Sequence, residues 1–152
     1  MKLQKDLKEF IELLNSQKVE YLIVGAYNLA LHSVPRFTGD IDIFVKVSRE
    51  NAARLKKVIQ AFGFGSTGLG AEDFLKPNQV IQLGIAPNRI DILTGLSGVE
   101  FDQAWASKET AHLDGLQVYM LSKELLIKNK LATGRPQDLA DVERLRNLRK
   151  ME

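Results

Sequence analysis

Two aspartates one residue apart, Asp40 and Asp42, are the side chains of this sequence best suited to chemistry. They lie in residues 38–45, a run that is otherwise largely apolar. If the run forms a β-strand, its two-residue period puts both carboxylates on one face, with their Cα atoms roughly 7 Å apart. Such a pair can hold a divalent cation. The alternative is a strand with a solvated acidic face, and the pair alone does not decide between the two.

A third aspartate, Asp91, has a similar setting, because apolar residues flank it within residues 89–93. If this segment is a strand beside the first one, Asp91 can point to the face that carries Asp40 and Asp42. Three carboxylates on one patch repel one another unless cations neutralise them, and oxygen ligands suit Mg²⁺ or Mn²⁺. Paired ions of this kind clamp the attacking and leaving oxygens of a displacement at phosphorus. Taken alone, Asp91 can also be an exposed strand residue.

Gly25 and Ala26 lie between a β-prone run and a helix-prone run. At such a turn, bare backbone and the free N–H groups of a helix start can bind an anion. Glycine also favours any strand-to-helix turn, so this feature has a purely structural interpretation as well. Arg36 and Thr38 precede Asp40 closely enough to reach the same site, and arginine pairs well with phosphate oxygens. A surface-loop arginine is the alternative for Arg36.

The elements that must position these side chains follow from hydrophobic periodicity and turn residues. Helices are expected over residues 3–17, 26–32, 49–62, 100–106, 122–133 and 136–149, the third with Ser48 as its N-cap and Gly63 as its C-cap. Strands are expected over residues 20–24, 38–45, 80–85 and 89–93 and as a short pair around 114–115, and residues 63–78 read as a loop. This alternation predicts an α/β (α+β) fold, with a mixed β-sheet flanked by helices.

Composition limits the class of protein. The 152 residues are 45% hydrophobic and 26% charged, which predicts one globular domain with a core at about 20–120 and C-terminal helices at about 122–149. The absence of cysteine excludes disulfide scaffolds, thiolate metal sites and cysteine nucleophiles. No apolar run approaches the roughly 20 residues of a membrane helix, and no secretory signal is seen, so we expect a cytoplasmic protein without a membrane partner. The net charge of +2 does not by itself indicate a nucleic-acid partner.

Together these motifs resemble the nucleotidyltransferase superfamily that includes kanamycin nucleotidyltransferase and the relatives of DNA polymerase beta. The pattern of that family is a hydrophobic strand, Gly followed by Gly or Ser, a spacer, Asp-hydrophobic-Asp-hydrophobic, and a later Asp on another strand. In this sequence residues 22–26 supply the strand and turn, 13 residues separate Ala26 from Asp40, and residues 40–43 and Asp91 supply the acids. Ala26 departs from the pattern, because it has no hydroxyl group to offer to a phosphate.

Residues 36–42 look especially like the small prokaryotic members, including those found in type IV toxin–antitoxin pairs. The C-terminal helices of that group often carry Lys, Arg, Asp-Leu and Asp before a leucine, an order matched by Lys128, Arg135, Asp138, Leu139, Asp141 and Leu145. Periodicity alone does not single out Lys128. Asp138 also has a structural interpretation, since a carboxylate in the first turn of a helix interacts favourably with the helix dipole.

The resemblance implies a nucleotidyltransferase fold with a C-terminal helical pair, and metal-dependent transfer of a nucleoside monophosphate from a nucleoside triphosphate. It implies Asp40, Asp42 and Asp91 as catalytic ligands of Mg²⁺ or Mn²⁺. The nucleotide-binding residues that it implies are Gly25, Ala26, Arg36, Thr38 and Lys128, with Arg135 and Asp138 as additional site residues.

The acceptor is left open among tRNA, protein and a small molecule. The alternative function is a nucleotide-binding or regulatory module with weakened turnover, for example one component of a toxin–antitoxin pair with a small helical partner protein. Ala26 and the short chain favour that alternative.

Overall fold

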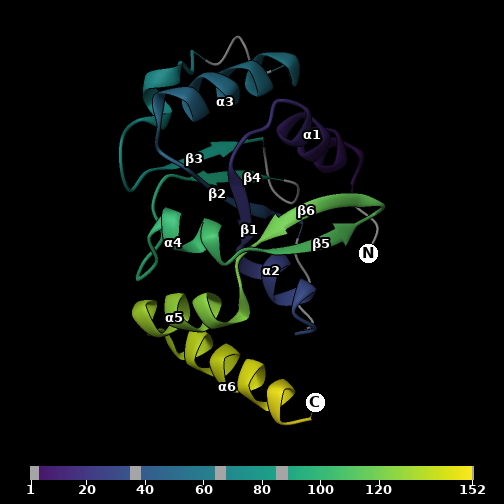
Figure 1. Cartoon of the computed structure of the whole chain (residues 1–152), viewed down its shortest axis with the longest axis vertical. Helices are drawn as coiled ribbons and strands as arrows, with labels where there is room; N and C mark the ends of the chain where they lie inside the picture. Colours follow the sequence, from purple (N-terminus) through teal and green to yellow (C-terminus); the bar gives the residue numbers. More distant parts are fainter. Residues whose placement is uncertain (1–3, 35–38, 64–67, 85–88, 152) are drawn as a thin grey trace.

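A computed structural model describes residues 4–34, 39–63, 68–84 and 89–151 (Figure 1). The strands within these ranges are β1 (Tyr21–Val24), β2 (Ile41–Val45), β3 (Val80–Leu83), β4 (Ile90–Leu93), β5 (Glu109–Leu113) and β6 (Leu116–Met120). The helices are α1 (Lys5–Ser16), α2 (Gly25–Leu31), α3 (Arg49–Ala61), α4 (Phe101–Ala106), α5 (Lys123–Thr133) and α6 (Pro136–Met151), with a 3₁₀ turn η2 (Ala71–Phe74). The strands form one sheet in the order β3-β4-β2-β1-β6-β5. The predicted mixed sheet flanked by helices is confirmed.

The register of the central strands lines up polar residues across the sheet. β2 runs antiparallel to β1, with Val24 opposite Asp42, and parallel to β4, with Asp42 opposite Asp91. β3 runs antiparallel to β4, with Gln82 opposite Asp91. Residues opposite one another in neighbouring strands point to the same face of the sheet. Gln82, Asp91 and Asp42 therefore form a row on one face, which we call the polar row, and Val24 continues this row on β1.

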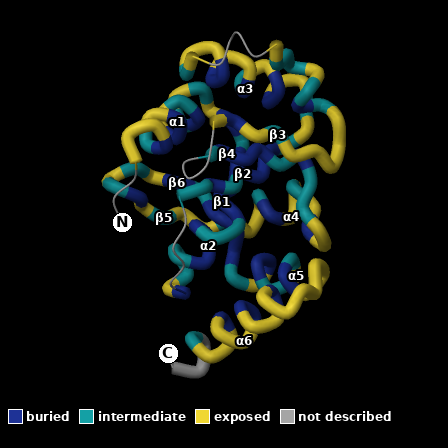
Figure 2. The backbone as a smooth tube through the Cα atoms, turned by 180° about the vertical axis from the view of Figure 1, so that it is seen from behind, coloured by how far each residue is buried: buried dark blue, intermediate teal, exposed yellow. Residues whose placement is uncertain are grey.

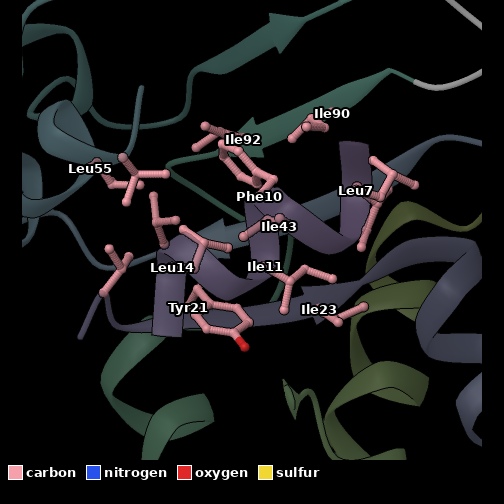
Figure 3. Packing of buried hydrophobic residues seen from close by; sticks show 14 of the residues in the cluster. Leu7, Phe10, Ile11, Leu14, Tyr21, Ile23, Ile43, Leu55, Ile90 and Ile92 are labelled. Carbon is pink, nitrogen blue, oxygen red and sulfur yellow. The ribbon is translucent and has the colours of Figure 1, made fainter. Parts of the chain in front are cut away.

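Helices α1 and α3 cover the opposite face of the sheet (Figures 1 and 3). Ile23, Ile43 and Ile92 point to this face because they alternate with the residues of the polar row. They are fully buried together with Phe10 of α1 and Leu55 of α3. This side is therefore a closed hydrophobic core that holds β1, β2 and β4 in register.

Helices α2, α4, α5 and α6 lie on the face that carries the polar row (Figure 1). Phe44, two residues after Asp42, is buried on this face with Leu22 of β1, Leu126 of α5 and Leu145 of α6. The outward side of α6 is largely exposed, whereas the central strands are buried (Figure 2). The polar row therefore lies beside this second hydrophobic cluster, on the same face of the sheet.

The expected helices and strands are all present, and their bounds differ by a few residues from the expected ones. Ser48 caps α3 as predicted, because its Oγ accepts a hydrogen bond from the Asn51 N–H at 3.1 Å. β2 begins only at Ile41, so Asp40 precedes the strand instead of lying in it. Residues 63–78 are not loop throughout, since η2 forms there and buries Phe74 in the core. Of the described helices, none combines the length and the apolar composition that crossing a bilayer requires.

Candidate active site

Asp42 and Asp91 form the centre of the polar row. They are paired in register between the parallel strands β2 and β4, and their carboxyl groups are hydrogen-bonded to each other. Burial, then the charge and hydrogen bond of Asp91, and to a smaller extent the charge of Asp40, raise the pKa of Asp42 to about 6. The neighbouring carboxylate therefore adds to burial in disfavouring the ionised form of Asp42.

Arg89 supplies positive charge to this cluster. Its Nε and Nη2 donate to the two carboxylate oxygens of Asp91 at 2.7 and 3.1 Å. Its Nη2 also lies 3.7 Å from Oδ2 of Asp40, and its backbone N–H donates to Oδ1 of Asp40 at 2.9 Å. The structure thus brings Asp40, Asp42 and Asp91 into one cluster, and a single guanidinium links two of them.

Gly25 brings the turn between β1 and α2 against Asp42. Its φ is +69°, a conformation that favours glycine. A Cβ atom at this position would collide with the Asp42 carboxyl group, whose Cγ would lie 3.0 Å away. The backbone therefore approaches the carboxylate closely because residue 25 has no side chain. Ala26 follows as a half-buried residue of α2, so the predicted glycine turn and the predicted acids meet in space.

Arg89 and Tyr27 belong to this cluster, and neither was expected from the sequence. Burial raises the pKa of the Tyr27 phenol, and the charge of Asp40 raises it further, so the phenol lies within electrostatic range of that carboxylate. A signal for Arg89 was present, because a residue two positions before Asp91 shares its strand face. Tyr27 had no such signal, since only the packing of α2 against the sheet places it near Asp40.

Asp138 lies in a second cluster, at the turn between α5 and α6. Lys130 Nζ lies 3.5 Å from Oδ1 of Asp138 and 3.0 Å from Oδ2 of Asp141. Arg135 Nε and Thr133 Oγ1 donate to Oδ2 of Asp138 at 2.8 and 2.7 Å. The hydrogen bond from Arg135, helped by Thr133 and the charge of Lys130, holds the pKa of Asp138 well below its usual range. This cluster joins the two helices.

The lysine of this second cluster is Lys130, which is buried, whereas Lys128 is exposed on α5. The carbonyl oxygen of Lys128 lies beside Gly98, in the segment that leads to α4. Figure 1 shows the α5–α6 turn beneath α4, on the side away from α2. The structure therefore places Arg135 and Asp138 at this turn and Lys128 in the middle of α5, and none of the contacts described here joins them to the aspartates of the sheet.

The expected residues Arg36 and Thr38 lie outside the described residues. Among residues 4–34, 39–63, 68–84 and 89–151, no three His, Cys, Asp or Glu side chains are grouped so as to hold a metal ion. The donor chemistry still fits a hard cation, since Asp42, Asp91 and Asp40 offer only oxygen ligands. Burial raises the pKa of Asp42 most, the carboxylates of Asp91 and Asp40 raise it further, and a divalent cation would offset the charge of these carboxylates. The three-carboxylate metal site stays a prediction.

Comparison with known proteins gives a match over nearly the whole sequence. Residues 1–150 match the model of the family described as nucleotidyltransferase of unknown function, DUF6036. No curated protein sequence matches the chain significantly.

Solved structures of similar fold include a candidate nucleotidyltransferase from Thermotoga maritima, with a TM-score of 0.54 and 21% identity over 95% of this chain and 89% of that one. The lincosamide antibiotic adenylyltransferase LnuA, with lincomycin bound, has a TM-score of 0.54 and 16% identity over 96% and 98% of the two chains. ANT(2″)-Ia in complex with adenylyl-2″-tobramycin has a TM-score of 0.56 and 15% identity over 91% and 84%. At these identities the similarity establishes a shared fold.

Proposed function

The chain belongs to the DUF6036 family of nucleotidyltransferases of unknown function, and on that basis we propose that it transfers a nucleoside monophosphate from a nucleoside triphosphate to an acceptor, with Mg²⁺ or Mn²⁺. The observation that carries this proposal is the contact between the Gly25 turn and the carboxyl group of Asp42, which is itself paired with Asp91. A backbone turn able to receive phosphates then lies against the acids that would receive the cation.

Asp42 and Asp91, with Asp40 beside them, would hold the cation. A bound ion would supply positive charge to the phosphate oxygens. Asp91 is proposed to help remove the proton of the acceptor group, directly or through the ion that it would hold. The backbone N–H groups that follow Gly25 would bind phosphate oxygens, and Ala26 would contribute its N–H without a hydroxyl group.

Arg36 and Thr38 remain proposed phosphate contacts, because both precede Asp40 closely in the sequence. Arg135 and Asp138 are left out of the proposed machinery, since they bond to each other at the α5–α6 turn, and Lys128 stays a proposed contact of the nucleotide. The acceptor class stays a proposal with three members: RNA, protein or a small molecule. The two antibiotic adenylyltransferases of similar fold favour including lincosamides and aminoglycosides among the small molecules to be tested.

The test is a transfer assay with each of the four nucleoside triphosphates, with Mg²⁺ or Mn²⁺, and with a panel of tRNA, protein and antibiotic acceptors. Pyrophosphate release and label incorporation are measured together, so that simple hydrolysis is recognised. We expect release by the wild type and none by Asp42→Asn. Asp102→Asn is the matched control, because Asp102 is 85% exposed and pairs with Lys46. Equal signal from the wild type and Asp42→Asn would overturn the proposal.

A second candidate function is a nucleotide-binding regulatory module with weakened turnover. Two observations favour it: Ala26 lacks the hydroxyl group of the family pattern, and Arg89 engages both oxygens of Asp91. Calorimetry separates the two functions, because the module binds a triphosphate with Mg²⁺ while the transfer assay yields no product. In that case a small helical partner protein becomes the next object of the search.

A further inference from the structure

The Arg89 guanidinium occupies the oxygens that a metal ion would need. Asp91 has two carboxylate oxygens, and Arg89 holds one through Nε at 2.7 Å and the other through Nη2 at 3.1 Å. The same Nη2 reaches to 3.7 Å from Asp40. A cation that binds Asp91 must therefore take at least one oxygen from the arginine.

The backbone of Arg89 is fixed independently of its side chain. Its N–H donates to Oδ1 of Asp40 at 2.9 Å, and its carbonyl oxygen accepts from the N–H of Ile41 at 3.0 Å. These bonds join the start of β4 to the start of β2. The guanidinium can therefore leave Asp91 by side-chain rotation while the two strands stay paired.

The side chain also has room to move. It is 32% exposed, whereas the Asp91 side chain is 10% exposed. An arginine released from Asp91 would carry its charge to the open side of the cluster. Guanidinium groups bind phosphate oxygens through paired hydrogen bonds, so the triphosphate is a suitable new partner.

We propose that the Arg89 side chain stands in for the divalent cation in the metal-free protein and binds the triphosphate when the cation takes Asp91. This rests on the proposed function, since it assigns the cation and the triphosphate to the same cluster. It makes metal binding and nucleotide binding cooperative, because the ion frees the side chain that the nucleotide uses.

Because Arg89 and the cation compete for Asp91, removing the arginine side chain should strengthen metal binding. Arg89→Met removes the guanidinium but keeps the backbone bonds to Asp40 and Ile41. We expect Mn²⁺ to bind this variant on the order of tenfold more tightly than the wild type, since no bound arginine must be displaced. The same variant should bind a nucleoside triphosphate on the order of tenfold more weakly in saturating Mg²⁺. A purely structural arginine would not tighten metal binding when removed.

The experiment is calorimetric titration of the whole chain with Mn²⁺ alone, and then with each triphosphate in saturating Mg²⁺. Arg89→Lys keeps the charge but cannot engage both oxygens of Asp91 in the same way, so its Mn²⁺ affinity should fall between those of the wild type and Arg89→Met. Arg54→Met is the control, because Arg54 lies on α3 on the opposite side of the sheet and donates to the carbonyl oxygen of Lys18. Its Mn²⁺ affinity should equal that of the wild type. Thermal melting with and without Mn²⁺ shows that each variant is folded.

The outcomes separate this inference from the proposed function. Equal or weaker Mn²⁺ binding by Arg89→Met overturns the inference, even if the wild type transfers nucleotides. Tighter Mn²⁺ binding and weaker triphosphate binding support it, even if no acceptor yields product. Absence of Mn²⁺ binding by both the wild type and Arg89→Met overturns the inference together with the metal-dependent function.

Discussion

The sheet and the α5–α6 turn each hold a cluster of aspartates, and the two clusters differ in charge balance. In the sheet cluster, as far as the described residues show, Arg89 pairs with Asp40 and Asp91, while burial and the neighbouring carboxylates raise the pKa of Asp42 to about 6. In the turn cluster, the two carboxylates of Asp138 and Asp141 face two cations, and the pKa of Asp138 is held low.

The contrast separates two uses of the same residue types. Carboxylates matched by bonded cations stabilise the fold, and removing one partner is costly because it leaves a buried charge alone. A carboxyl group whose pKa is raised by burial and by neighbouring carboxylates costs stability when it ionises, and such groups are typical of functional sites. We therefore interpret the turn cluster as a structural joint and the sheet cluster as the functional site.

The largest expected effect comes from neutralising the sheet cluster. Asp42→Asn should reduce nucleotide transfer at least about a thousandfold, because it removes a charged oxygen ligand at the centre of the row. Asp138→Asn should leave kcat/KM of the folded fraction within about fivefold, because the described partners of Asp138 are Lys130, Thr133 and Arg135 at the end of α5 and the turn that follows it. The transfer assay at a temperature at which both variants are folded checks this. Loss of activity in Asp138→Asn with the fold intact would break the comparison, since the turn cluster would then serve the reaction.

The next effect concerns stability at the turn. Lys130→Met should lower the free energy of unfolding by roughly 3 kcal/mol, because Asp138 and Asp141 would stay buried without their shared ammonium group. Lys128→Met is the matched control, and a change below about 0.5 kcal/mol is expected for this exposed lysine. Urea unfolding of the two variants measures the difference. Similar losses of unfolding free energy in both variants would show that the ion pairs of Lys130 do not stabilise the contact between α5 and α6.

A glycine at each cluster gives a third test. Gly25→Ala should cost roughly 2 kcal/mol and abolish transfer, because φ is +69° and the new Cβ would displace the Asp42 carboxyl group. Gly134→Ala should cost only about 1 kcal/mol of stability, from placing alanine at a φ of +65°. The added Cβ would not clash, because the nearest atom would lie 3.7 Å away. Thermal melting and the transfer assay measure both effects. Full activity in Gly25→Ala would show that the close approach to Asp42 is not needed.

The smallest effect is a pH dependence of opposite sign in the two clusters, measured without metal. The folded protein binds the Asp42 proton more tightly than the unfolded chain, so this residue costs stability as the pH rises from about 4 to about 6. The free energy of unfolding of Asp42→Asn, relative to that of the wild type, should therefore rise by on the order of 1–2 kcal/mol between pH 4 and pH 7. Asp138 has a lowered pKa, so its stabilisation is present above about pH 4 and is lost in more acid solution. Asp138→Asn should accordingly lower the free energy of unfolding more at pH 7 than at pH 3. If the free energies of unfolding of the two variants changed with pH in the same direction relative to the wild type, the account would be contradicted.

Much of the fold was predictable because it depends on local signals. The Ser48 cap, the apolar strands and the turn at Gly25 each follow from residue type and spacing. The meeting of Asp42 and Asp91 needed one further assumption, that their strands lie side by side, and the register confirms it. The start of β2 at Ile41 was not predictable, because the pairing partners of the neighbouring strands decide where a strand begins.

The rest depends on contacts between distant segments. Lys128 and Lys130 are both flanked by apolar residues, and only the packing of α6 on α5 buries Lys130 between two aspartates. Period-two spacing puts Arg89 on the face of Asp91, but its bond to Asp40 needs β2 beside β4. Charge balance within a cluster is therefore a property of the assembled fold and was not visible in the sequence.

Calorimetric titration with each of the four nucleoside triphosphates, in Mg²⁺ and in a chelator, tests the central claim most directly. The account predicts that the wild type and Asp138→Asn bind at least one triphosphate in Mg²⁺ and lose most of that affinity in the chelator. It predicts that Asp42→Asn binds at least about tenfold more weakly. Equal affinity of Asp42→Asn and the wild type in Mg²⁺ would contradict the assignment of the sheet cluster as the nucleotide and metal site.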